Sequence, residues 1–195
     1  DADVVVDFST PDSALSNARL CVEAGVHCVM GTTGADFSSL EGVGTGKLFV
    51  APNFAIGAVM MMRLSQQVAE HMPECEIIEL HHDQKADAPS GTAVATVRRI
   101  QDERDGSWRG PLAESLEGVR GGDVEGIRVH AVRLPGLVAH QEVIFGGQGQ
   151  TLTIRHDSTD RSSFMPGVLM AARAVMVRPG LTIGLERLLD LPPLP

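Results

Sequence analysis

Three short apolar runs separated by helix signals constrain the fold of the first fifty residues most strongly. Asp3–Phe8, Val26–Met30 and Leu48–Ala51 are rich in valine and other apolar residues, which is typical of strands buried on both faces of a parallel sheet. The stretches between them predict a helix over residues 11–24 and a shorter helix around residues 36–43. Strands that alternate with helices in this way predict right-handed βαβ units and a parallel sheet.

The pattern changes in the second half of the chain. We expect a helix over Ile56–Met72, a strand over Cys75–Leu80, a helix over residues 90–104, an irregular glycine-rich connection over residues 105–126, and then three strands, Ile127–Leu134, Leu137–Phe145 and Gln150–His156, the last two joined as a hairpin by Gly146–Gly149. A helix capped by Ser162 or Ser163 and a short strand after Gly180 close the chain. We therefore predict an α/β protein in which an α+β region begins between about residues 55 and 80.

The charge and the cysteines exclude several classes of partner. A net charge of −9 on 195 residues argues against binding to nucleic acid or to a membrane surface, because phosphate groups are bound by a basic face. No apolar run approaches the ~18 residues of a membrane span, and no signal peptide is visible. Cys21, Cys28 and Cys75 lack C-x-x-C spacing and predict buried thiols in a reducing compartment, so we expect a cytoplasmic protein.

The segment Glu79–Ala93 concentrates polar chemistry at the end of a predicted strand. Adjacent side chains on a strand point to opposite faces, so His81 and His82 suit two separate roles better than one shared metal site. Their spacing does not favour zinc. Lys85 follows within loop reach, and it is one of only two lysines. A histidine and a lysine beside an anionic substrate supply a proton donor and a cation, as hydride addition to a charged, unsaturated substrate requires. The alternative is a solvated turn before a capped helix.

Two further features predict ligand contacts. Ser90, Gly91 and Thr92 begin a helix, where unpaired N–H groups and the helix dipole favour a carboxylate or phosphate; the alternative is that Ser90 is only an N-cap. Gly31–Gly34 and Ala51–Phe54 each follow a parallel strand. Ligands of open α/β sheets bind at this edge, although such segments also occur as ordinary turns. The usual G-x-G-x-x-G dinucleotide fingerprint is absent from the sequence.

The run E-L-H-H-x-x-K-x-D-A-P-S-G-T-A at Glu79–Ala93 closely resembles the signature of bacterial dihydrodipicolinate reductases (4-hydroxy-tetrahydrodipicolinate reductases). The resemblance extends over essentially the whole chain. It includes V-V-V-D-F-S near the start, G-T-T-G at 31–34, A-P-N-F at 51–54, the run at 129–146, and residues 151–158. It implies NAD(P)H-dependent reduction of hydroxy-tetrahydrodipicolinate to tetrahydrodipicolinate, in the diaminopimelate and lysine pathway, by a homotetramer.

The resemblance also implies roles for residues and domains. His81 resembles the proton donor or acceptor and Lys85 a second general acid; the residues that resemble the dicarboxylate-binding groups are His82, Ser90, Gly91 and Thr92. Contacts to the nicotinamide side of NADH or NADPH are implied for Gly31, Thr32, Thr33, Ala51, Pro52, Asn53 and Phe54. Residues 1–54 and 163–195 would form a partial Rossmann-like dinucleotide-binding domain. Residues 55–162 would form the substrate-binding domain, whose mixed sheet makes the tetramer.

One departure from the family concerns the cofactor. Family members begin with a further strand, a G-x-x-G-x-x-G phosphate loop, a helix and a second strand, and the present sequence resembles a member without that portion. We therefore expect this chain by itself to bind the dinucleotide poorly and to have little activity. The alternative function is a non-catalytic oligomerisation or partner subunit of the same fold.

Overall fold

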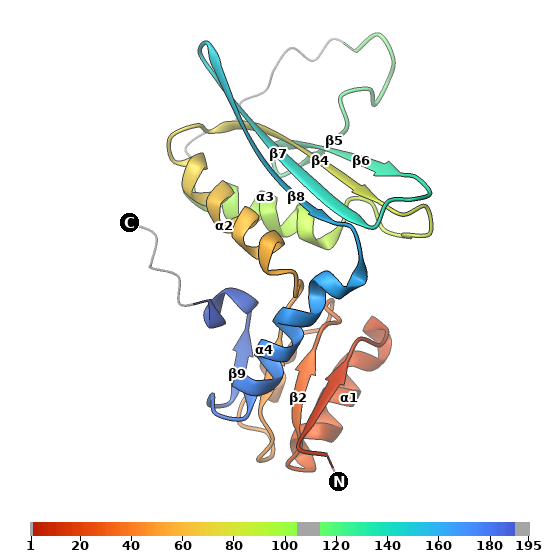
Figure 1. Cartoon of the computed structure of the whole chain (residues 1–195), viewed down its shortest axis with the longest axis vertical. Coiled ribbons are helices and arrows are strands. Elements are labelled where there is room, and N and C mark those ends of the chain that lie inside the picture. Colours follow the sequence, from red (N-terminus) through yellow and green to blue (C-terminus); the bar gives the residue numbers. More distant parts are fainter. Residues whose placement is uncertain (1, 105–113, 190–195) are drawn as a thin grey trace. The chain divides into compact units, whose positions relative to one another are not determined.

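The computed structural model describes residues 2–104 and 114–189, and these residues form two compact units (Figure 1). The first unit contains the described residues up to Val59 and those from Ser162 onward. The second unit is Met60–Arg161. The chain therefore leaves the first unit within one helix, completes the second unit, and returns.

A four-stranded sheet, in the order β1-β2-β3-β9, forms the centre of the first unit. Its strands are β1 (Val4–Asp7), β2 (His27–Met30), β3 (Leu48–Val50) and β9 (Leu181–Ile183), and every neighbouring pair is parallel. The parallel sheet is as predicted from the alternation of strands and helices. Because all four strands run the same way, their carboxyl ends meet at one edge of the sheet.

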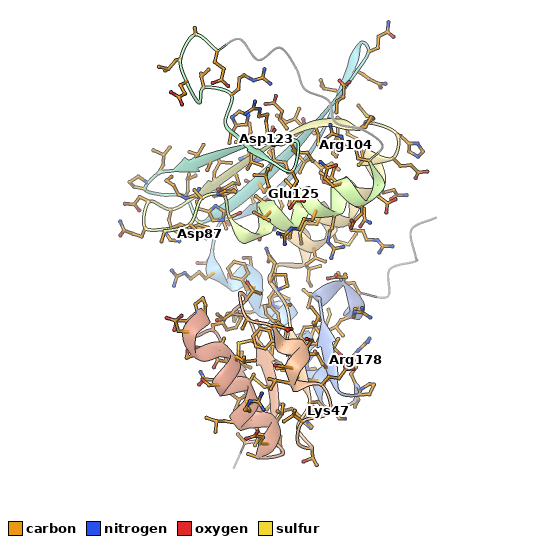
Figure 2. All side chains as sticks on the ribbon, turned by 180° about the vertical axis from the view of Figure 1, so that it is seen from behind. Lys47, Asp87, Arg104, Asp123, Glu125 and Arg178 are labelled. Atoms are coloured by element: carbon orange, nitrogen blue, oxygen red, sulfur yellow. The ribbon has the colours of Figure 1, made fainter. Side chains whose placement is uncertain are left out.

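Helices cover the two faces of this sheet. The helix α1 (Pro11–Glu23) packs its buried alanines and Val22 against the side chains of Cys28 and Met30. Val29 points to the opposite face, and the helix α4 (Met165–Val175) contacts β2 and β3 there (Figure 1). Lys47 beside β3 donates from Nζ to the carbonyl oxygen of Met176, 2.7 Å away, just after α4 (Figure 2).

Three local predictions for the first unit need correction. The shorter helix expected at residues 36–43 is a single 3₁₀ turn, η1 (Phe37–Leu40), which Asp36 caps and which positive-φ glycines follow at once. The last helix begins at Met165 after another 3₁₀ turn, η2 (Arg161–Phe164), so neither predicted serine is its N-cap. Pro166 in the first turn explains that start, because proline is accepted there and poorly further in. The first strand is not wholly buried, since Val6 is 44% exposed.

A mixed five-stranded sheet, in the order β5-β6-β4-β7-β8, forms the centre of the second unit. Its strands are β4 (Glu74–His81), β5 (Gly122–Val124), β6 (Ile127–Arg133), β7 (Ala139–Gly147) and β8 (Gln150–Ser158). The central pair β4 and β6 is parallel, and the other pairs are antiparallel. Gly147 pairs with Gln150, so the β7–β8 hairpin turns on Gln148-Gly149.

One face of this sheet carries the core. The helix α3 (Gly91–Glu103) and the end of α2 (Ile56–Ala69) lie on it (Figure 1). The buried cluster consists of Ala69, Cys75, Ile77, Ala93, Val97, Ile100, Ile127, Val129, Val143 and Phe145. The alternate residues of the strands, among them Glu76, His130 and Glu142, point to the other face, which no described helix covers.

Strand β5 lies in a stretch for which the sequence predicts only an irregular connection. Its hairpin with β6 turns on Glu125 and Gly126, whose φ values of 50° and 86° are both left-handed (Figure 2). The sequence did not predict this turn, because asparagine or aspartate, and not glutamate, is the residue that usually precedes glycine in such a hairpin turn. Residues 105–113 of that connection lie outside the described chain. In the described residues, no helix combines the length and apolar character that crossing a membrane requires.

Candidate active site

The candidate site lies where the helix-facing side of β4 changes from apolar to polar. Cys75 and Ile77 on this side belong to the core, and Glu79 and His81 follow at the same two-residue spacing. Strand β6 runs parallel to β4 and places Arg133 opposite His81. The sequence therefore brings a carboxylate, an imidazole and a guanidinium together at the carboxyl end of two adjacent strands.

The carboxylate of Glu79 is the centre of this group, and its side chain is completely buried. Its Oε2 accepts from His81 Nδ1 at 2.5 Å and from Arg133 Nη1 at 2.9 Å. Its Oε1 accepts from Arg133 Nη2 at 2.7 Å and from the backbone N–H of Ser90 at 3.2 Å. A carboxylate has about four acceptor positions, so these four bonds use all of them.

These bonds keep Glu79 ionised. Burial by itself raises the pKa of Glu79, but the hydrogen bonds and charges of His81 and Arg133 outweigh burial and hold the pKa below its ordinary value. The buried negative charge of Glu79 is therefore compensated by the hydrogen bonds and charges of His81 and Arg133, as a buried charge generally requires.

Arg133 also fixes the loop that follows β4. Besides its two bonds to Glu79, its Nη1 donates to the Val132 carbonyl at 2.8 Å and its Nη2 to the Asp87 carbonyl at 2.7 Å. The four terminal N–H groups of the guanidinium are thus engaged by the protein itself. The fifth N–H, on Nε, is buried and has no hydrogen-bond partner in the described residues. Because the four outer N–H groups already bind protein oxygens, the arrangement of Arg133 favours support of the site over contact with a ligand.

Lys85 lies in the same loop and pairs with Asp87, with Nζ and Oδ1 2.6 Å apart (Figure 2). The side chains of Lys85 and Asp87 are 22% and 59% exposed. Burial raises the pKa of Asp87, but its bond with Lys85 outweighs this and the pKa lies below its ordinary value. A partly exposed lysine paired with an acidic side chain can exchange that partner for a substrate carboxylate.

The helix α3 begins beside this loop. Ser90 is its N-cap: the side-chain oxygen accepts from the N–H of Ala93 at 3.1 Å, while the backbone N–H of Ser90 bonds to Glu79. Gly91 is exposed, and a Cβ atom placed there would meet nothing within 4 Å. The first turn of the helix is therefore open above Gly91, where the N–H groups of a helix start favour an anion.

The strand ends of the first unit divide into buried and accessible residues. Ala51 and Phe54 are buried, and the ring of Phe54 lies edge-on to that of Phe8, with ring centroids 5.5 Å apart. Pro52 and Thr33 are exposed. The seven residues predicted to contact the cofactor thus offer a mixture of core side chains and accessible backbone, and all follow β2 or β3 at one edge of the parallel sheet.

Three of these residues have roles within the fold. A Cβ atom at Gly31 would lie 2.1 Å from the ring of Phe8, so any side chain there would have to displace this exposed ring. The hydroxyl of Thr32 donates to the carbonyl of Ser9 at 2.5 Å. Asn53 accepts from the N–H of Ala55 through its side-chain oxygen at 2.8 Å, just before α2 begins.

The predicted substrate residues lie in one continuous segment of the second unit. His81, His82, Lys85, Ser90, Gly91 and Thr92 all fall between the end of β4 and the first turn of α3. The predicted cofactor residues all lie in the first unit. In the described part of the chain, no group of three metal-binding side chains occurs, and the three cysteines are free.

Glu79, Arg133 and Asp87 belong to the site, although the sequence patterns did not predict them as members. The sequence could have indicated a role for Glu79, because a carboxylate on the helix-facing side of a central strand needs a buried partner for its charge. No local pattern could have indicated Arg133, because only the pairing of β4 with β6 places it beside His81.

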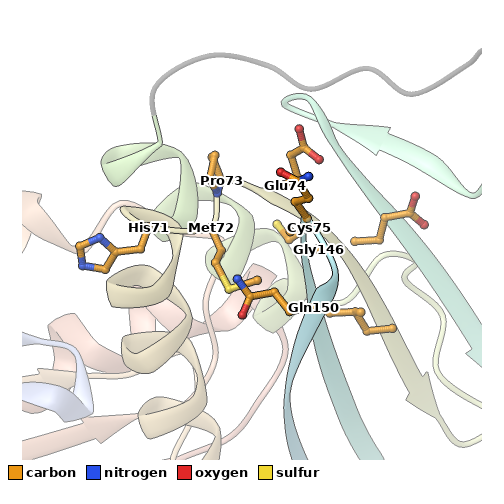
Figure 3. A pocket seen from close by; sticks show the side chains of 11 residues that line it. His71, Met72, Pro73, Glu74, Cys75, Gly146 and Gln150 are labelled. Atoms are coloured by element: carbon orange, nitrogen blue, oxygen red, sulfur yellow. The ribbon is translucent and has the colours of Figure 1, made fainter.

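A separate hollow of about 690 Å³ opens at the other end of the second unit (Figure 3). Its lining includes Met72, Cys75 and Ile144 together with Gly146 and Gln150 of the β7–β8 hairpin. It adjoins the beginning of β4, whereas His81 ends that strand. The hollow is therefore distinct from the candidate site.

Comparisons with known proteins agree with this geometry. Residues 1–54 match the family model described as "Dihydrodipicolinate reductase, N-terminus", and residues 57–189 match "Dihydrodipicolinate reductase, C-terminus". A 4-hydroxy-tetrahydrodipicolinate reductase of Nocardia farcinica (strain IFM 10152) is 56% identical over 201 residues, covering 97% of this chain and 81% of the relative. One of Mycolicibacterium gilvum (strain PYR-GCK) is 54% identical over 200 residues, covering 98% and 82%.

A solved structure is also similar. The dipicolinate-bound dihydrodipicolinate reductase from Paenisporosarcina sp. TG-14 superposes with a TM-score of 0.81 at 46% identity, covering 95% of this chain and 73% of that one. Family models that match nearly every residue, together with relatives above half identity, confirm the resemblance found in the sequence. The chain therefore belongs to the dihydrodipicolinate reductase family.

Proposed function

We propose that this protein is an oxidoreductase that uses NADH or NADPH to reduce 4-hydroxy-tetrahydrodipicolinate to tetrahydrodipicolinate, in lysine and diaminopimelate biosynthesis. The observation that carries the proposal is the grouping of His81, Lys85 and an open helix start within one segment. Relatives at 52–56% identity bear the name of this reductase, which adds independent support.

The net chemistry explains why the site needs acids. Reduction replaces the 4-hydroxyl group by hydrogen, so a hydride and a proton enter and water leaves. A positioned acid can supply that proton in the transition state. We assign this role to His81, which is held by Glu79, and a second acidic role to Lys85 once its ammonium group has left Asp87.

The two carboxylates of the substrate need two separate anion sites. The first turn of α3 offers one, because Gly91 leaves open space next to helix N–H groups and the Ser90 side chain is already engaged as the cap. Lys85 and His82 in the preceding loop offer positive charge and a hydrogen-bond donor for the other. Thr92 lies in the same helical turn as Gly91 and adds a hydroxyl group.

The first unit supplies the cofactor side of the proposal. The carboxyl edge of a parallel sheet is where α/β proteins hold nucleotides, and the accessible backbone around Thr33 and Pro52 suits a flat nicotinamide ring. Gly31, Thr32, Ala51, Asn53 and Phe54 complete the proposed contact segments and shape that edge. When bound, the nucleotide supplies the hydride.

We also propose a homotetramer in the cytoplasm. The second sheet has one face covered by helices and another that carries partly buried Ile78, Leu80 and Ile144 among charged side chains, with no described helix upon it. Such a mixed face suits association with further copies. The three free cysteines fit a reducing compartment.

The direct test is an activity assay of the purified chain with 4-hydroxy-tetrahydrodipicolinate and either NADH or NADPH. Because the chain is expected to bind the dinucleotide poorly by itself, we expect slow, substrate-dependent loss of the reduced nicotinamide absorbance and formation of tetrahydrodipicolinate at high nucleotide concentration. Complete inactivity with both cofactors, at any concentration of the chain, would contradict the proposal and favour a non-catalytic subunit.

Titration with dipicolinate examines the substrate segment separately. We expect Gly91→Val to weaken dipicolinate binding by at least roughly tenfold, because the branched side chain fills the open space at the helix start. Gly146→Val is the matched control, since Gly146 also has open space but lies on β7 at the other end of the sheet. Equal affinity of wild type and Gly91→Val would remove this helix start from the binding site.

A further inference from the structure

The hydrogen bonds around Glu79 determine which nitrogen of His81 carries the ring proton. Glu79 is ionised and accepts at both oxygens, and an ionised carboxylate cannot donate. The contact with His81 Nδ1 at 2.5 Å therefore requires that Nδ1 be the donor. In the neutral ring the proton must stay on Nδ1, which leaves the lone pair on Nε2.

Nε2 is the atom left for chemistry. The side chain of His81 is 13% exposed, and its contact with Glu79 uses Nδ1 and leaves Nε2 out of that bond. When the ring is protonated, Nε2–H is the acid that can face a ligand, and the Nδ1–H bond to Glu79 persists before and after the transfer. A hydrogen bond to the other ring nitrogen, such as the one from Nδ1 to Glu79, fixes the orientation and the tautomer of a functional histidine.

Arg133 and Ser90 explain why Glu79 itself cannot turn away. Three of the four bonds to Glu79 come from outside its own strand or from backbone: two from the guanidinium on β6 and one from the N–H at the start of α3. Rotation of the carboxylate would break all three of these bonds in a buried place, where unpaired polar groups are strongly unfavourable. Arg133 in turn holds the loop carbonyl of Asp87.

We infer that Glu79 is a positioning residue, which holds His81 with Nδ1 protonated and Nε2 directed to the reaction and ties its ring to the helix start that binds the substrate. The inference rests on the proposed function, because it gives a role in the proton transfer assigned to His81. The inference adds Glu79 to the residues predicted for the site. Arg133 then acts by holding the carboxylate of Glu79 in place.

Nuclear magnetic resonance of isotope-labelled histidine tests the tautomer in the wild-type protein. At a pH where the rings are neutral, we expect His81 to carry its proton on Nδ1. His130 is an internal contrast, because its Nε2 bonds to Glu76 at 2.8 Å on the opposite face of the sheet, and it should carry its proton on Nε2. The His81→Asn variant identifies the His81 signals. A wild-type His81 with its proton on Nε2 would overturn the inference.

The variant Glu79→Gln tests the kinetic consequence. The amide oxygen is held by the donors Ser90 N–H and Arg133 Nη2, so the amide NH₂ faces His81 and the ring proton should move to Nε2. A neutral ring with that proton is a far weaker acid than imidazolium. We therefore expect kcat to fall roughly 10²–10⁴-fold, the range for a general acid, while KM changes less than about fivefold, because substrate binding in the ground state is retained.

The control is Glu125→Gln, which removes an exposed carboxylate of the same unit, and we expect its kcat to equal that of the wild type. A folded Glu79→Gln protein with wild-type kcat would refute the inference, and so would a retained Nδ1 proton. If Glu79→Gln does not fold, the position of the ring proton of His81 in the wild-type protein, measured by nuclear magnetic resonance, still tests the inference. An inactive wild-type chain would instead refute the proposed function, whatever the tautomer.

Discussion

Replacing Arg133 by methionine should destabilise the second unit more than any change at an exposed ion pair. The substitution removes the two bonds from the guanidinium to the completely buried carboxylate of Glu79. It also releases the carbonyl of Asp87, to which the guanidinium donates. His81 and the Ser90 N–H would remain as the donors to Glu79, and its charge would lose its cationic partner.

The magnitude follows from the burial of the pair. Removing one partner of a buried ion pair costs about 3–5 kcal/mol, because the other charge is left uncompensated. The matched control is Arg98→Met, whose pair with Glu125 has side chains 67% and 50% exposed. An exposed pair is worth about 0–1 kcal/mol. The two variants remove the same side chain type, so their difference reports the buried partner.

Urea unfolding followed by circular dichroism measures both free energies of unfolding. We expect the double variant Glu79→Gln, Arg133→Met to regain most of the stability lost by Arg133→Met, because no buried charge remains. The slope of the transition should stay constant, since the same surface is exposed on unfolding. Equal losses for Arg133→Met and Arg98→Met, or no recovery in the double variant, would refute the reasoning.

Two other predictions concern stability. The pKa of Glu79 lies below its ordinary value of 4.5, so its contribution to stability is present above pH 4.5 and is lost as the pH falls through the folded-state pKa; acid titration of unfolding should show a smaller loss for the double variant than for wild type, and an equal loss would contradict this. Gly167→Ala should lower stability by about 1–3 kcal/mol, because its Cβ atom would lie 2.1 Å from the carbonyl oxygen of Phe54; Gly146→Ala, which meets nothing within 4 Å, is the control in the same thermal melts, and equal melting temperatures would show that the helix can shift at no cost.

Local patterns were sufficient to predict most of the fold. Alternating strands and helices predicted the parallel sheet of the first unit. The change to consecutive strands predicted an α+β second region, whereas its mixed sheet was implied only by the family resemblance. The errors fall where a single residue decides the local geometry. Pro166 places the start of α4, and Glu125 occupies a left-handed position where its identity gives little signal.

The site could be predicted only where it is continuous in sequence. His81, Lys85 and Gly91 lie within one short segment, so their types and spacing by themselves indicate polar chemistry. Arg133 joins them through strand pairing across a separation of 54 residues from Glu79, and no local pattern encodes that contact. Gly31 shows a second limit, because the sequence pattern indicates only space for a ligand there, whereas in the structure a Cβ atom at this position would also lie 2.1 Å from the ring of Phe8.

The most direct test of the central claim is the turnover of Lys85→Ala compared with wild type, in the 4-hydroxy-tetrahydrodipicolinate assay with the preferred nicotinamide cofactor. Lys85 is partly exposed and pairs with the exposed Asp87, so the variant should fold normally, as its thermal melt can verify. We expect kcat to fall roughly 10²–10⁴-fold, the contribution of a general acid. A Lys85→Ala protein with the wild-type kcat would contradict the assignment of this segment as the reductase site.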